Sequence, residues 1–351
     1  MNRKFDLLDR RKFLQGTICS SALALTGMES AARSNQIASD ATPSAEKDSL
    51  GTKSFNAFEL DENRVRFYSD KIKKKTNILI LSDTHLFMDD KRGESYRSFS
   101  ARMAKAYNKT SHYRTRKQTN PCESFAGTLD YAAKSKTFDA IVVLGDLVSF
   151  PSEAGIDWAC KKLNSCGVPW YYISGNHDWH YEGMPGSEKE LRTEWTQKRL
   201  SPLYQGHDPM AYSVDLPGVR LILIDDSIYE ILPEQLDFFK RQVREGVPMI
   251  LMMHIPLYAP GRSVGFGCGH PDWNADHDLN WKIERRPQWP KNGHSDITME
   301  FYRTVFTASN LAGIFTGHTH KQTLDVVNGK PQFAVTANAQ GGFMTAEFLP
   351  R

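Results

Sequence analysis

Short clusters of Asp, Asn and His recur along the chain, and nearly every cluster follows a run of apolar residues. Asp83 and His85 come directly after the run at 77–82, and Asp146 follows the run at 140–144. The later clusters are Asn176-His177-Asp178, His254 and His318-Thr319-His320. A mixture of imidazole and carboxylate suits Mn, Fe or Zn, and an Asp can join two ions. These residue types indicate a metal centre that several segments build together.

The spacing within two clusters has a geometric interpretation. Residues two apart in an extended segment share a face, so we expect Asp83 and His85 to reach the same ion. His318 and His320 would do the same if the backbone between them is extended, although ligands of different ions are equally possible there. Three glycines come directly before cluster residues, where they would let the backbone turn sharply beside the ions: Gly145, Gly175 and Gly317.

The apolar runs that precede the clusters predict strands buried on both faces of a sheet. They lie at 77–82, 140–144, 170–173, 221–224, 249–253 and 312–315. Helical patterns lie between several of them, at 123–134, 153–163, 188–200, 234–243 and 298–308. Strands that alternate with helices indicate an α/β fold, and Pro217-Gly218 and Asn328-Gly329 each predict a hairpin. In open α/β sheets, ligands bind outside the carboxyl ends of the strands, so the clusters should converge.

The ordered blocks DxH, GD, GNHD, H and GHxH, within 77–320, resemble those of the calcineurin-like metallophosphoesterase superfamily. The resemblance implies a four-layer αββα sandwich with two central mixed β-sheets. It also implies two divalent or trivalent metal ions, either Mn, Fe or Zn, held by seven side chains. By that resemblance, one ion would be bound by Asp83, His85 and His320, the second by Asn176, His254 and His318, and Asp146 would bridge them.

The reaction implied by the resemblance is hydrolysis of a phosphate ester. Two ions about 3.5 to 4 Å apart lower the pKa of a shared water, and the bridging hydroxide attacks phosphorus in line. His177 resembles the family histidine that protonates the leaving oxygen or stabilises its charge, and Asp178 is expected to orient the His177 ring. We expect a phosphodiester substrate of the cyclic-nucleotide, nucleotide or phospholipid type. The alternatives are a phosphomonoesterase for nucleotides or sugar phosphates, and a non-catalytic metal-binding or scaffold protein on the same fold.

Two departures narrow the resemblance within the superfamily. Purple acid phosphatases carry a Tyr three residues after the bridging Asp, where this chain has Ser149, and protein Ser/Thr phosphatases end the third block in GNHE rather than GNHD. The pattern is more similar to the bacterial class that includes cyclic-nucleotide phosphodiesterases and related phospholipid or nucleotide esterases.

Two segments are interpreted as insertions, at about 89–121 and 259–293, because structureless stretches of this length are uncommon unless they are functional. The first has seven Lys/Arg between Arg97 and Lys117 and no acidic residue, which fits either a rim that faces phosphate or a solvated basic loop. The second is expected to cap the metals, with His270 contacting substrate, although its tryptophans could form a satellite core instead. The remaining histidines are expected at the surface: His180, His207, His277 and His294.

The N-terminal 1–32 resemble a twin-arginine export signal, because Arg10-Arg11 precede Phe13-Leu14 and an uncharged run at 16–28 that is too short to span a bilayer. We expect export to the periplasm or beyond through the twin-arginine machinery, without a stable membrane anchor. The polar segment 33–56 is interpreted as a flexible linker and 57–351 as the metallophosphoesterase domain. A formal net charge of +3 implies no nucleic-acid partner, so the expected ligand is a small phosphate ester.

Overall fold

The computed structural model describes residues 56–106 and 108–351 of the 351-residue chain. The predicted export signal at 1–32 lies outside the described residues, and so does the predicted linker except for its last residue, Asn56. Within the described part of the chain, no helix combines the length and the apolar character needed to cross a membrane.

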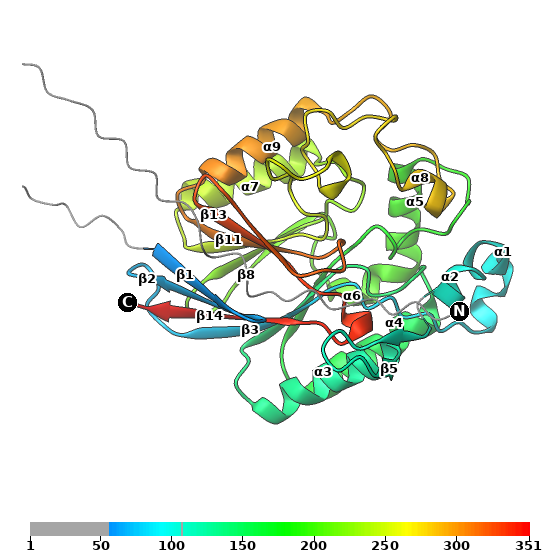
Figure 1. Cartoon of the computed structure of the whole chain (residues 1–351), viewed down its shortest axis with the longest axis horizontal. Coiled ribbons are helices and arrows are strands. Elements are labelled where there is room, and N and C mark those ends of the chain that lie inside the picture. Colours follow the sequence, from blue (N-terminus) through cyan, green and yellow to red (C-terminus); the bar gives the residue numbers. More distant parts are fainter. Residues whose placement is uncertain (1–55, 107) are drawn as a thin grey trace, which may run out of the picture. The chain divides into compact units, whose positions relative to one another are not determined.

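Two six-stranded mixed sheets form the centre of the fold (Figure 1). The strand order in the first sheet is β1 (Asn56–Asp61), β2 (Arg64–Ser69), β14 (Met344–Pro350), β3 (Thr76–Leu81), β6 (Ala140–Leu144) and β7 (Trp170–Ile173). The order in the second sheet is β12 (Thr323–Val327), β13 (Lys330–Ala334), β11 (Leu311–Thr316), β10 (Met249–Met252), β9 (Arg220–Ile224) and β8 (Ala211–Asp215). Strands β3, β6 and β7 run parallel, as do β13, β11, β10 and β9. The predicted α/β fold with two mixed sheets is confirmed.

The two sheets pack face to face through aromatic side chains. Phe67 of β2 lies edge-on to Phe315 of β11 and Phe333 of β13, with ring centroids 6.2 and 6.1 Å apart. Such edge-to-face pairs are favourable beyond the apolar area they bury. These contacts between the sheets hold in place the strands whose ends carry the polar clusters.

Helices cover the outer faces of the two sheets (Figure 1). On the side of the first sheet lie α3 (Pro121–Ser135) and α4 (Glu153–Cys166), and on the side of the second lie α7 (Pro233–Glu245) and α9 (Asp296–Thr307). A further helix, predicted as one piece, is divided into α5 (Glu188–Trp195), a π-helical turn (Thr196–Leu200) and α6 (Ser201–Tyr204). Its N-terminus has a capping box formed by Ser187 and Glu190.

Both predicted hairpins are present, because β8 pairs antiparallel with β9 and β12 pairs antiparallel with β13. Strands β1, β2 and β14 were not predicted from the sequence. Buried and half-buried residues alternate in β2, β1 has no fully buried residue, and β14 mixes polar with apolar residues, so none of the three forms a continuous apolar run. A short 3-10 helix, Asn338–Gln340, leads into β14.

The two predicted insertions contain only short elements. The first holds a 3-10 helix (Lys91–Tyr96), α1 (Arg97–Ser100), α2 (Met103–Ala106) and the small ribbon of β4 (Thr110–Ser111) and β5 (Gln118–Thr119). The second holds a 3-10 helix (Val264–Phe266) and α8 (Trp281–Glu284). Helices α2 and α8 lie at the same end of the fold (Figure 1). The guanidinium of Arg102, directly before α2, donates a hydrogen bond to the carbonyl oxygen of Ile283 in α8.

Candidate metal centre

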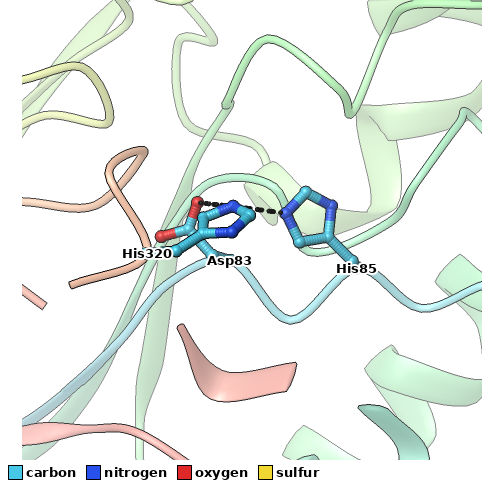
Figure 2. A group of neighbouring side chains, drawn as sticks. All are labelled: Asp83, His85 and His320. Carbon is cyan, nitrogen blue, oxygen red and sulfur yellow. Dashed lines mark hydrogen bonds and ion pairs between the residues drawn. The ribbon is translucent and has the colours of Figure 1, made fainter. Parts of the chain in front are cut away.

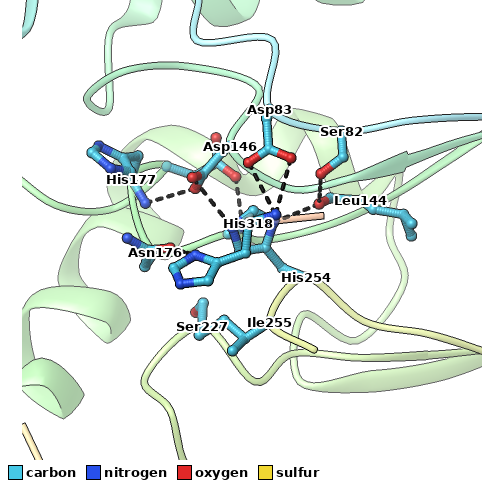
Figure 3. A network of polar contacts seen from close by, with 12 residues as sticks. Ser82, Asp83, Leu144, Asp146, Asn176, His177, Ser227, His254, Ile255 and His318 are labelled. Atoms are coloured by element: carbon cyan, nitrogen blue, oxygen red, sulfur yellow. Dashed lines mark hydrogen bonds and ion pairs between the residues drawn. The ribbon is translucent and has the colours of Figure 1, made fainter. Parts of the chain in front are cut away.

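The polar clusters meet where strands of both sheets end. Those that follow β3, β6 and β7 come from the first sheet, and those that follow β10 and β11 come from the second. Figure 3 draws residues from all five clusters within one network of contacts. Most of these side chains are buried, although few large apolar groups surround them: Asp83, His85, Asp146, Asn176 and His254. Buried ionisable groups are costly unless they are paired or bind a cation, so this concentration points to a binding site.

One group of candidate ligands consists of Asp83, His85 and His320 (Figure 2). Their ligand atoms all lie within 4.8 Å of one another. The Nε2 atoms of His85 and His320 are 3.0 Å apart, and His320 Nε2 is 3.4 Å from Asp83 Oδ1. Two imidazole nitrogens and a carboxylate oxygen that converge on one point are a suitable set for a transition-metal ion.

The second group consists of Asp146, His254 and His318, whose ligand atoms also lie within 4.8 Å of one another. Asn176 joins it, because its Oδ1 is 3.1 Å from His318 Nδ1 (Figure 3). His254 Nδ1 is 2.7 Å from the Leu144 carbonyl oxygen, so Nδ1 carries the proton and donates it there. This leaves Nε2, 3.2 Å from Asp146 Oδ2, as the atom that would bind a metal ion once it has lost its proton.

Asp146 lies between the two groups. Its Oδ2 is 3.2 Å from His254 Nε2 in the second group and 3.8 Å from His85 Nε2 in the first. Its Oδ1 accepts a hydrogen bond of 2.8 Å from the backbone N–H of His177, which fixes the plane of the carboxylate. One carboxylate can therefore serve both cation positions, and the donor atoms fit a pair of ions.

The backbone at the centre is not extended, so the predicted reason for the DxH spacing was wrong. Asp83 and His85 have φ angles of +54° and +53°, and His318 and His320 have +64° and +59°. The DxH segment is held instead by hydrogen bonds to the GD segment. Asp83 N donates to Gly145 O at 3.0 Å, and His85 N donates to Asp146 O at 2.8 Å. The turn of this backbone aims both side chains at the same point.

All three glycines are required by close approach of other groups, because a Cβ atom on Gly145, whose φ is +73°, would overlap the backbone of Gly175. A Cβ atom on Gly317 would overlap the Ser82 hydroxyl, and one on Gly175 would overlap Asp146. Both neighbours belong to other cluster segments. A side chain at either position would therefore push the segments that carry the candidate ligands apart.

The charges of the centre are balanced in a way that favours a cation. Burial alone would raise the pKa of Asp146, but His254, His177 and His85 hold that pKa well below its ordinary value. Burial would lower the pKa of His254, yet Asp146 raises it to about 10. At His318 burial prevails and the pKa falls to about 4. In the protein alone, a proton on His254 occupies the place where a metal ion would supply positive charge.

His177 and Asp178 do not interact as predicted. His177 lines the cavity beside both ligand groups, and its ring centroid is 5.0 Å from that of His85. The Asp178 oxygens accept hydrogen bonds from the backbone N–H groups of Val148 and Gly175, at 2.9 and 2.8 Å. Burial and the Asp146 charge raise the pKa of Asp178 to about 7. Asp178 therefore joins the GD and GNHD segments to each other, and no described hydrogen bond links it to the His177 ring.

The cavity at the centre is closed on its outer side by residues of both insertions: Arg102, Met103, Ala106, Asn280, Ile283 and Glu284. The predicted substrate contact, His270, is not among the lining residues. Its ring packs on Tyr258 with centroids 4.0 Å apart, and its Nδ1 accepts a hydrogen bond from Asp272 N at 3.0 Å. The second insertion thus contributes to the cavity beside the candidate ligands, but through α8 and the residue before it rather than through His270.

Sequence reasoning missed Glu284, which orients a candidate ligand. Its Oε1 accepts a hydrogen bond of 3.3 Å from Asn176 Nδ2, so the Asn176 amide oxygen must face the second ligand group. Its Oε2 accepts a bond of 2.5 Å from Arg286, which in turn contacts Asp278 at 2.9 Å. All three charged side chains are buried. Nothing in the local sequence marks Glu284, because its role depends on contacts across the fold.

The basic residues of the first insertion lie in two different places, one beside the cavity and one at a separate surface. Arg102 lines the cavity and is paired with the buried carboxylate of Glu182, with Nε 2.6 Å from Glu182 Oε2. Arg114 instead contacts Asn63 and Glu62 at a separate surface. Tyr107, between these arginines, lies outside the described residues.

The tryptophans of the second insertion largely form the predicted satellite core. Trp273 and Trp289 are buried. Trp289 stacks on Trp179 with ring centroids 5.8 Å apart, and Trp273 packs on Tyr229 at 5.4 Å. The insertion is therefore anchored to the fold by aromatic contacts while α8 faces the cavity.

Two of the four histidines predicted at the surface are buried instead. The His180 Nε2 atom is 3.1 Å from the Glu284 carbonyl oxygen, and the His294 Nδ1 atom is 3.1 Å from Glu230 Oε1. Both rings serve to anchor segments that the sequence alone could not place beside them. His277 is exposed, as predicted, and His207 is half-buried against Tyr212.

Comparison with known proteins was made at the level of family, sequence and structure. The family model described as calcineurin-like phosphoesterase matches residues 76–322. A curated protein of Psychrobacter arcticus, named a probable cyclic nucleotide phosphodiesterase, is 24% identical over 192 residues, which are 52% of this chain and 57% of that protein. The match thus spans little more than half the length of this relative.

Two solved structures with a similar arrangement belong to phosphatases. A dimetal phosphatase from Danio rerio is 12% identical, with a TM-score of 0.48, over 77% of this chain and 91% of that chain. A purple acid phosphatase from yellow lupin (Lupinus luteus) is 14% identical, with a TM-score of 0.43, over 79% and 47%. The family model spans well over half of the sequence, including every candidate ligand. The chain therefore belongs to the calcineurin-like phosphoesterase family.

Proposed function

We propose that this protein hydrolyses phosphodiesters with the help of two metal ions. The observation that carries the proposal is the position of Asp146 Oδ2, 3.2 Å from His254 Nε2 and 3.8 Å from His85 Nε2. A carboxylate oxygen between histidines of two ligand groups is the arrangement needed to hold a pair of ions at one reacting centre. Asp83, His85 and His320 hold one ion, Asn176, His254 and His318 hold the second, and Asp146 is shared.

The bound ions, as Mn, Fe or Zn, supply Lewis acidity and lower the pKa of water at the centre. The chain's own residues then position the substrate and move protons. His177 lies in the cavity beside Asp146 with its backbone N–H fixed on that carboxylate. From there its ring can donate a proton to the leaving oxygen of the ester, which matters most for a poor leaving group.

A diester substrate is favoured over a monoester by two observations. The relative from Psychrobacter arcticus carries the name of a cyclic nucleotide phosphodiesterase. The cavity also extends from the candidate ligands to a wall made by both insertions, which leaves room for an organic group beyond the phosphorus. The second candidate function is hydrolysis of nucleotide or sugar phosphomonoesters. The complete set of candidate ligands and the presence of His177 in the cavity weigh against a non-catalytic scaffold.

Metal analysis combined with two chromogenic esters tests the proposal. The protein loaded with Mn²⁺, Fe²⁺ or Zn²⁺ should contain about two ions per chain. It should hydrolyse bis-p-nitrophenyl phosphate with a higher kcat/KM than p-nitrophenyl phosphate. The reverse order of the two esters would establish the monoesterase, and tight binding of two ions without turnover of either ester would establish the scaffold.

We also propose that the chain is exported by the twin-arginine route. The proposal rests on the order of Arg10-Arg11, Phe13-Leu14 and the uncharged run at 16–28. A fusion of residues 1–56 to a reporter that folds in the cytoplasm should appear in the periplasm of a bacterial host. Replacing Arg10 and Arg11 by Lys should retain the reporter in the cytoplasm, and export that survives this change would contradict the proposal.

A further inference from the structure

The outer wall of the cavity differs chemically from its floor. The floor is made of candidate ligands and His177, all of them polar. The outer wall also carries the polar residues Arg102, Asn280 and Glu284, but unlike the floor it includes apolar side chains as well. These are Met103 and Ala106 of α2 and Ile283 of α8. Ligand sites commonly combine a few polar groups that fix the reacting part with apolar surface that binds the remainder.

Ile283 is unusually exposed for an aliphatic residue. Its fractional exposure is 64%, and that of Leu279, next to the lining residue Asn280, is 71%. Among the large apolar side chains of the described residues these two are the most exposed. Packing in the hydrophobic core therefore does not explain why apolar residues occupy these two positions. Exposed apolar groups gathered at one place mark a surface that binds something, and here that surface borders the candidate metal centre.

The position of the apolar wall is fixed by polar contacts on either side. Arg102 joins α2 to α8 through the Ile283 carbonyl oxygen at 3.1 Å, and it also binds Glu182. Glu284, directly after Ile283, is held by Asn176 and Arg286. The backbone that carries the Ile283 side chain is thus held at the Ile283 carbonyl group and at Glu284. The side chain itself borders the cavity and is exposed to solvent.

We propose that Met103, Ala106 and Ile283 form an apolar subsite for an organic substituent of the phosphate ester. This inference rests on the proposed function, because the subsite matters only if the phosphoryl group is bound at the metals. The substrate class is an ester of an apolar alcohol, with an alkyl or aryl group, in preference to an ester of a polyhydroxylated alcohol such as a sugar or glycerol.

The subsite is tested by binding of alkyl phosphates to the metal-loaded protein, measured by titration calorimetry. Methyl, butyl and hexyl phosphate present the same phosphoryl group, and glycerol phosphate matches butyl phosphate in length. Each methylene should tighten binding by about two- to fourfold, so butyl phosphate, with three more methylenes, should bind about 8- to 60-fold more tightly than methyl phosphate. Glycerol phosphate should bind within about twofold of methyl phosphate, because its hydroxyls gain nothing from apolar surface.

Two variants locate the effect. Ile283→Ser should reduce the gain per methylene to less than half of its value in the unchanged protein. Val326→Ser is the matched control, because Val326 is also exposed, at 53%, but lies on strand β12 and not in the cavity wall. It should leave the dependence on chain length unchanged. Equal melting temperatures of the two variants would show that neither change disturbs the fold.

The outcomes separate the subsite from the enzyme. Binding of methyl phosphate without any dependence on chain length would overturn the subsite and leave the proposed function standing. A dependence that persists in Ile283→Ser would overturn the assignment to this wall. If the metal-loaded protein binds no phosphate ester at all, the proposed function fails and the subsite fails with it.

Discussion

The two ligand groups differ in how firmly the surrounding protein holds them. In the second group, His254 is fixed by the Leu144 carbonyl oxygen and Asn176 by Glu284. The backbone N–H of His254 is held as well, by Asp226 at 3.1 Å. In the first group, both Asp83 oxygens accept from the backbone N–H of His318, at 3.1 and 3.0 Å, but the His320 side chain retains 29% exposure and lines the cavity. Because outer hydrogen bonds orient metal ligands and strengthen binding, we expect the second group to bind its ion more tightly and the first to exchange its ion more readily.

The most severe test of this comparison removes the residue that both groups share. Asp146→Ala should lower kcat by about 10³-fold or more, because the two ions supply several kcal/mol of transition-state stabilisation. The ion of the first group should be lost before that of the second. Turnover and metal content, measured on the same preparation, check this prediction. Two retained ions with full activity would show that Asp146 bridges nothing.

The next change separates chemistry from metal binding. His177→Ala should lower kcat by about 10²- to 10⁴-fold for an alkyl ester, since a proton donor to the leaving oxygen is lost. Esters of p-nitrophenol, whose leaving group needs little protonation, should be affected much less. Metal content should stay at its original value because His177 belongs to neither ligand group. An equal loss for both kinds of ester would argue against proton donation by His177.

A subtler change addresses the support of the second group. Glu284→Gln replaces one carboxylate oxygen by an NH2 group, which cannot accept a hydrogen bond. The oxygen that remains is needed by Arg286, so Asn176 is no longer held with its amide oxygen toward the second ligand group. Affinity at one of the two sites should fall by about 10- to 100-fold while the other site keeps its affinity. Metal titration followed by calorimetry measures both. Glu230→Gln is the control, since Glu230 is another largely buried carboxylate and lies in neither ligand group. The comparison between the groups would be wrong if the two variants bound metal alike.

The smallest expected effect is a proton released on metal binding. The pKa of His254 in the protein alone is raised to about 10, mainly by Asp146 acting against burial, so the ring is protonated at neutral pH. A metal ion at Nε2 must displace this proton. Apparent affinity should therefore fall up to tenfold for each pH unit below about 10 and level off above it. Calorimetry in buffers of different ionisation enthalpy should detect release of about one proton at pH 8 when the ion of the second group binds. Binding without proton release would show that His254 is not a ligand.

The core of the fold could be predicted because parallel strands that are buried on both faces appear in the sequence as continuous apolar runs. Each such run also ends at the same edge of its sheet, which is why the five clusters could be expected to meet. Strands β1, β2 and β14 escaped this reasoning. Their alternating pattern is weaker, and the pairing of β14 with β3 joins residues more than 260 positions apart, such as Phe348 and Thr76. No local pattern specifies such a partner.

Three of the errors at the site have a common cause, because each concerns the direction of a side chain. Asp178 follows His177 in sequence, yet its carboxylate turns to the backbone of Val148 and Gly175. His270 lies in the second insertion, which borders the cavity, yet its ring turns to Tyr258. Glu284 was missed for the same reason. A cluster can be located from residue types alone, whereas the partners of a single side chain depend on turns that the sequence does not reveal.

The left-handed backbone at five candidate ligands has a consequence for the protein before it meets a metal. Asp83, His85, Asp146, His318 and His320 all carry a Cβ atom at positive φ. Each such residue costs about 1 to 2 kcal/mol, and an ordinary domain is stable by only about 5 to 15 kcal/mol. Without metal ions, the chain must therefore tolerate this backbone strain at the place where strands of both sheets end. Bound cations would offset the strain, and their loss should make this region the first to unfold locally.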